Sequence, residues 1–140
     1  MDMEIENELL KEYKDFITTH VNYKCKILPK TPQSLSSFPT IIFKESNNSD
    51  YSLAKSVENY EYMNQLLYTV EIYTKDTVVS DEIIKSRTIM LELKELTFEF
   101  FRNVGFRRMS CNRGEYPDFT VDRLIIVEQG KINNWNKKII

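Results

Sequence analysis

Few side chains in this sequence combine the types and spacing that catalysis or metal binding requires. The chain has one histidine, His20, and two cysteines, Cys25 and Cys111. The cysteines lie far apart and outside any CxxC or Cys/His spacing, so we expect free thiols and no zinc site. His20 continues an apolar helical stripe without a recognisable catalytic set, which predicts a helix-end or core histidine. The sequence also has no glycine-rich phosphate-binding motif, and we expect neither a metal nor a cofactor.

The strongest hint of catalysis is an acid and a lysine near the end of the sequence. Pro117-Asp118 is followed by Glu128-Gln129-Gly130-Lys131, which is close to the PD-(D/E)xK pattern of metal-dependent nucleases. In that pattern the acid and the lysine are two positions apart on one strand and face one metal ion. Glu128 and Lys131 are three apart and would face opposite ways, and Gly130 favours a turn. We expect no enzymatic activity, with a nuclease as the alternative from a different class.

A group of arginines offers a second kind of chemistry. Arg107, Arg108 and Arg113 lie near Tyr116 and Phe119 in the sequence, as in basic patches whose aromatic rings stack on nucleic-acid bases. Alternation along a strand would place Arg107 and Arg108 on opposite faces unless a bulge intervenes. The net charge of −2 also lacks the basic excess of nucleic-acid binders. We therefore interpret the arginines as solvated or intersubunit charges.

The length and composition indicate one folded domain over residues 1–140. Hydrophobic residues make up 41% of the 140 positions, and only three glycines and four prolines occur, which is typical of a globular chain. The first residues are acidic and do not form a secretory signal. No apolar run approaches the roughly 20 residues that span a bilayer, so we expect no membrane association.

Apolar periodicity predicts two helices. One covers residues 3–20, with apolar positions three and four apart and charged residues between them. The other begins at Ser80, an N-cap residue followed by Asp81 and Glu82. Its buried stripe is Ile89, Leu93, Leu96, Phe100 and Val104. Gly105 supplies the left-handed residue that ends the helix.

Alternating β-branched and aromatic residues predict strands at 23–27, 38–45 and 65–73, and a hairpin of strands at 107–112 and 119–127. Strands on either side of one long helix predict an α+β fold. In this fold a mainly antiparallel sheet has the long helix and the N-terminal helix packed on one face.

The segment 46–59 is polar and too long for a tight turn. It predicts a projecting loop, and its apolar residues Tyr51 and Leu53 could dock on a partner while Asn48 and Asp50 let it change shape. A C-terminal tail at 131–140 contains Trp135. The candidate assembly residues are therefore Asn48, Asp50, Tyr51, Leu53, Arg107, Arg108 and Trp135.

Four short sequence segments show a resemblance that spans nearly the whole chain: FPTIIFKESNN at 38–48, YTVEIYTKD at 68–76, GFRR at 105–108 and VDR at 121–123. With their order in the chain, they resemble the tail terminator, or tail completion, proteins of tailed bacteriophages. The resemblance implies an α+β protomer that assembles into a ring, usually a hexamer. Such a ring caps the tail tube and joins it to the head connector.

The resemblance also implies the partners and the location. The chain would contact itself, the tail tube protein and the head–tail connector proteins, and DNA would pass through the lumen without specific binding. It would be a virion component of the tail or neck, assembled in the cytoplasm of the bacterial host. A head-completion or connector-stopper protein of the neck is the alternative within the same structure.

Overall fold

A computed structural model describes the backbone of residues 3–50, 63–133 and 138–139, and the side chains of residues 8–45 and 66–130. The elements in chain order are α1 Met3–His20, β1 Lys26–Leu28, β2 Thr40–Asp50, β3 Met63–Thr74, β4 Thr77–Val79, β5 Glu82–Ile84, α2 Ser86–Asn103, β6 Arg107–Gly114, β7 Asp122–Asn133 and β8 Lys138–Ile139. In this part of the chain, neither helix is long and apolar enough to cross a membrane.

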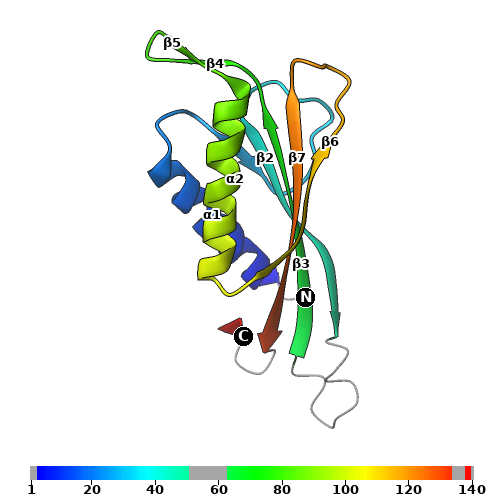
Figure 1. Cartoon of the computed structure of the whole chain (residues 1–140). Coiled ribbons are helices and arrows are strands. Elements are labelled where there is room, and N and C mark those ends of the chain that lie inside the picture. Colours follow the sequence, from blue (N-terminus) through cyan, green and yellow to red (C-terminus); the bar gives the residue numbers. More distant parts are fainter. Residues whose placement is uncertain (1–2, 51–62, 134–137, 140) are drawn as a thin grey trace.

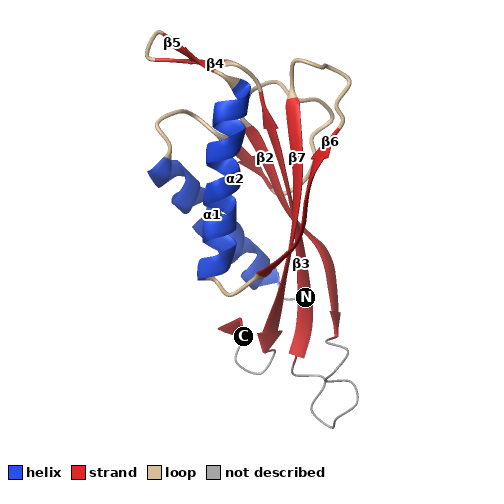
Figure 2. Ribbon diagram, in the orientation of Figure 1, coloured by secondary structure: helices blue, strands red, loops and turns tan. Residues whose placement is uncertain are grey.

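The main sheet has the strand order β1-β2-β3-β7-β6, and β8 pairs with the far end of β7. Strand β1 runs parallel to β2, whereas the other neighbours are antiparallel. Both helices lie against one face of this sheet (Figures 1 and 2). The expected α+β architecture, with a mainly antiparallel sheet and helices on one face, is confirmed.

The helices bury their apolar stripes in one aromatic core. Tyr13 of α1 stacks on Phe43 of β2 with ring centroids 4.6 Å apart, and Phe43 stacks in turn on Phe101 of α2 at 5.7 Å. The Tyr13 hydroxyl and Thr97 Oγ1 form a buried hydrogen bond of 2.8 Å that joins α1 to α2. The predicted stripe of α2 is thus largely confirmed, although Leu96 is only half-buried and the polar Thr97 is fully buried.

The predicted start of the long helix is wrong. Ser80 and Asp81 have positive φ angles of 52° and 66° and form the two-residue turn between β4 and β5, as a type I′ hairpin requires. Helix α2 begins six residues later, at Ser86, whose amide donates a 2.8 Å hydrogen bond to Asp76 Oδ1. The predicted end is correct, because Gly105 has a φ of 88°.

Strand boundaries also differ from the sequence expectations. Strand β2 continues to Asp50, so residues 47–50 of the predicted 46–59 loop pair with β3, and Ser46 lies at a bulge. Strand β7 continues to Asn133, which includes the start of the predicted 131–140 tail, and Gly130 lies inside it instead of in a turn. A Cβ atom at Gly130 would lie 2.7 Å from the Phe106 ring, so this position needs glycine for packing. Strand β1 begins at Lys26, three residues after the expected start.

Candidate assembly interface

The two arginines of the candidate interface lie on opposite faces of edge strand β6. Arg108 pairs with Glu128 across the strands and places its guanidinium 4.1 Å from the centre of the Phe98 ring on α2. Arg107 pairs with Gln129 and is exposed. A bulge occurs only after Arg108, before Ser110. Arg108 is therefore held against α2, whereas Arg107 is accessible from the other face.

Glu128 is a buried acid beneath α2. Burial raises the pKa of its carboxyl from 4.5 to about 7, and Arg108 offsets part of this rise. Because the folded-state pKa is above the unfolded value, the protonated form stabilises the fold. That contribution is complete below the unfolded pKa and is lost as the pH rises through about 7.

We expect wild-type protein to lose about 2 to 3 kcal/mol of unfolding free energy between pH 5 and pH 8 relative to Glu128→Gln. Gln cannot ionise, so the unfolding free energy of the variant lacks this dependence on pH. Urea unfolding of both proteins across the pH range checks the difference. Parallel pH profiles would contradict the expectation.

The other candidate residues are less fully placed. Asn48 and Asp50 lie in β2, where their backbones pair with Leu66 and Asn64 of β3. The side chains of this end of β2 fall outside the described set, as do residues Tyr51, Leu53 and Trp135 altogether. The expectation that 46–59 is an assembly loop therefore concerns a segment of which only the first five backbone positions are described.

The acidic residues of the nuclease-like pattern are not brought together. Asp118 is exposed in the β6–β7 connection, where it accepts a 2.9 Å hydrogen bond from the Thr120 amide. Glu128 lies six strand residues beyond the start of β7, or about 20 Å along an extended strand. Among the residues with described side chains, no three or more His, Cys, Asp or Glu residues gather as metal ligands.

A groove of about 510 Å³ lies between α2 and the β6–β7 pair. Its basic lining residues are Arg87 and Lys94 from α2 and Arg113 from β6, whereas Arg123, which also lines it, turns its guanidinium to Glu71 of β3. Leu91, which is 55% exposed, adds an apolar surface. The acid in the lining, Asp122, accepts a 2.6 Å hydrogen bond from the Ser86 hydroxyl. This surface, the α2/β6 groove, therefore combines apolar and basic side chains.

The β4–β5 hairpin differs from the groove because its exposed charged residues are acidic. Val78 and Ile83 are directly paired across its two strands and are 67% and 66% exposed. Its turn residues Ser80 and Asp81, and Glu82 beside them, are also exposed. The hairpin projects from the end of the molecule where α2 begins (Figure 1). It is therefore an apolar surface with an acidic tip.

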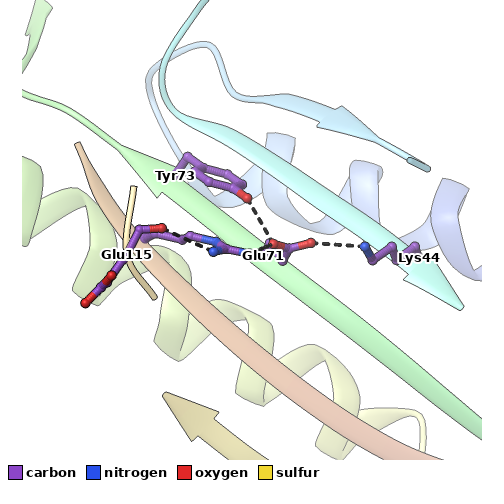
Figure 3. Close-up of polar contacts among 5 residues, drawn as sticks. Lys44, Glu71, Tyr73 and Glu115 are labelled. Atoms are coloured by element: carbon purple, nitrogen blue, oxygen red, sulfur yellow. Dashed lines mark hydrogen bonds and ion pairs between the residues drawn. The ribbon is translucent and has the colours of Figure 1, made fainter. Parts of the chain in front are cut away.

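A charged cluster on the helix-free face of the sheet is a further finding. Buried Glu71 of β3 accepts hydrogen bonds from Arg123 of β7 and from the Tyr73 hydroxyl, and forms a 3.2 Å ion pair with Lys44 of β2. Figure 3 shows this row across three strands, which ends where Arg123 donates to the Glu115 carbonyl. Burial alone would raise the pKa of Glu71, but Arg123, Tyr73 and Lys44 lower it below its ordinary value. The cluster joins β2, β3 and β7.

Of the groove, the β4–β5 hairpin and the Glu71 cluster, the hairpin has a local sequence pattern from which it could have been predicted. The β-branched triplet TVV before Ser80-Asp81 and the β-branched pair in EII after it are typical of a two-residue hairpin. The groove and the Glu71 cluster join residues from distant elements, and no local pattern marks them.

No protein-family model matches this chain, and no curated protein sequence matches it.

Proposed function

We propose that this chain is the tail terminator protein of a tailed bacteriophage. Copies of it form a ring, a hexamer in this proposal, that caps the completed tail tube and joins it to the head connector. DNA passes through the lumen without specific binding, and the ring is part of the virion after assembly in the bacterial cytoplasm. The protein acts by binding its neighbours and not by catalysis.

Two of the sequence segments that suggest this function pair with each other in the sheet. The segments FPTIIFKE and VEIYTKD contain adjacent parts of β2 and β3, with Ile41 paired to Ile72 and Phe43 paired to Val70. The phrase GFRR connects α2 to β6. The resemblance therefore concerns the framework of the sheet.

The main support from the surface is that one protomer carries two dissimilar exposed patches, the α2/β6 groove and the β4–β5 hairpin. A ring closes through heterologous contacts, in which one patch of a subunit meets a different patch of its neighbour. A protomer with one self-complementary patch would form a closed dimer instead. The two patches therefore favour ring assembly over a simple dimer.

The proposal predicts that the purified chain binds the ends of tail tubes. Electron microscopy of the protein mixed with tubes that lack a terminator should show a ring at one end of each tube, and native mass spectrometry should give the mass of six chains. Tubes incubated with serum albumin serve as the control. A protein that leaves the tube ends bare, at concentrations where it is folded, would contradict the proposal.

A further inference from the structure

The β4–β5 hairpin is held rigidly at its base. Asp76 accepts the Ser86 amide at 2.8 Å and lies 3.6 Å from the Lys85 ammonium, so both ends of the hairpin are joined. Thr74 Oγ1 and Ser86 Oγ form a 2.8 Å hydrogen bond beneath it. Ile84, which pairs with Thr77, packs against the core, whereas Val78 and Ile83, which pair with each other, are exposed. The exposed apolar pair is therefore on a positioned element.

An isolated hairpin with three residues per strand is marginal in water by itself. The exposed side chains of Val78 and Ile83 also contribute none of the stabilisation that burial of apolar surface would give. Their exposure is best explained by a partner that covers them. The acidic tip formed by Asp81 and Glu82 indicates that this partner is basic.

The α2/β6 groove has the complementary properties. Leu91 and Met90 supply apolar contact, and Arg87 and Arg113 stand on its two sides. Lys94 lies 4.0 Å from exposed Glu95 of its own helix, a weak surface pair that leaves the groove basic. Residues 87–94 of a helix extend about 10 Å, and a three-residue strand also extends about 10 Å. The groove is thus of a length that one hairpin strand fills.

We propose that the β4–β5 hairpin of one protomer docks in the α2/β6 groove of a second copy of this chain. Val78 and Ile83 cover Leu91 of the neighbour, and Asp81 and Glu82 lie against its Arg87 and Arg113. This inference rests on the proposed self-assembly, and it names the contact that forms the ring. Because the hairpin and the groove are different surfaces, repetition of the contact adds copies head to tail until the ring closes.

Four variants test the contact by sedimentation velocity over a range of protein concentrations. Val78→Thr/Ile83→Thr keeps β-forming residues but removes the apolar pair, and should lower the apparent association constant by about tenfold or more. Asp81→Asn/Glu82→Lys and Arg87→Glu/Arg113→Glu should each weaken association. The two charge changes combined in one chain should restore much of it. Met109→Thr, at a 54% exposed apolar residue of β6, is the matched control and should associate as wild type does.

A cross-linking measurement works even where association is weak. Ile83→Cys protein mixed with Leu91→Cys protein should form a disulfide-linked dimer on mild oxidation, whereas each variant alone should form far less. Weakened association of the hairpin variant together with the mixed disulfide supports the docking. Wild-type association in Val78→Thr/Ile83→Thr, or a mixture that gives no more disulfide than the single variants, overturns it.

The outcomes separate this inference from the proposed function. If Val78→Thr/Ile83→Thr still forms rings that cap tail tubes, the docking contact is wrong and the terminator function stands. If wild-type protein forms hairpin-dependent oligomers that do not bind tube ends, the contact stands and the terminator function is wrong. Wild-type protein that is monomeric at every concentration, together with Ile83→Cys and Leu91→Cys proteins that give no mixed disulfide, overturns the contact.

Discussion

Replacing Phe100 by Ala is expected to lower the free energy of unfolding by about 3 to 5 kcal/mol. Phe100 is 4% exposed and lies where α1, α2 and the sheet meet. Its ring packs edge-on against Tyr13 at 5.2 Å and Phe101 at 5.4 Å, and also contacts Phe16 and Phe43. Truncation would leave a cavity lined by rigid rings that cannot close it.

Chemical denaturation of the two proteins measures this loss. Phe119→Ala is the control, because Phe119 is also a phenylalanine but is 94% exposed, and its replacement should change the unfolding free energy by less than about 0.5 kcal/mol. A loss below about 1 kcal/mol for Phe100→Ala would mean that the stripe of α2 does not form the core.

Replacing Arg123 by Met is expected to cost about 2 to 3 kcal/mol of unfolding free energy. Met keeps much of the apolar stem but removes the guanidinium that donates to Glu71. Glu71 is 5% exposed and would remain buried with only Lys44 and Tyr73 as partners. The loss of unfolding free energy therefore reflects a buried carboxylate whose desolvation is no longer offset by the Arg123 guanidinium.

Lys75→Met provides the matched control, since Lys75 pairs with Asp118 at 3.8 Å where both side chains are largely exposed. Exposed pairs contribute about 0 to 1 kcal/mol.

The pH dependence of the unfolding free energy gives a second check. Because the folded-state pKa of Glu71 is lowered, its contribution is present above the unfolded pKa and is lost as the pH falls through the folded value. Arg123→Met should reduce this loss of unfolding free energy at acid pH. If Lys75→Met and Arg123→Met lower the unfolding free energy equally, the proposed role of the Glu71 cluster is wrong.

The sequence predicted the elements whose signals are local. The stripe of α2 and the left-handed Gly105 follow from a period of 3.6 residues and from the freedom of glycine at positive φ. Ser80 was misleading because Ser-Asp-Glu satisfies an N-cap pattern, yet the β-branched residues on both sides favour a hairpin. Asp76 supplies the acceptor at the true helix start, from a position ten residues earlier.

The candidate site was predictable only in part, for the same reason. The opposite faces of Arg107 and Arg108 follow from strand alternation, which is local. The stacking of Arg108 on Phe98 depends on how α2 lies over β6, which a single sequence does not specify. The groove and the Glu71 cluster depend on the register among β2, β3 and β7, whose residues are far apart in the chain.

The pairing of β3 with β7 has a consequence for the speed of folding. This pair forms the middle of the sheet, but it joins residues 63–74 to residues 122–133, with α2, β6 and the β4–β5 hairpin between them. The chain must close this long loop before the central ladder contributes any stability, and closure costs entropy that grows with loop length. Folding dominated by such non-local pairs takes milliseconds to seconds instead of microseconds. Helix α2 and the β2–β3 pair can form early, but the sheet is complete only when β7 enters between β3 and β6.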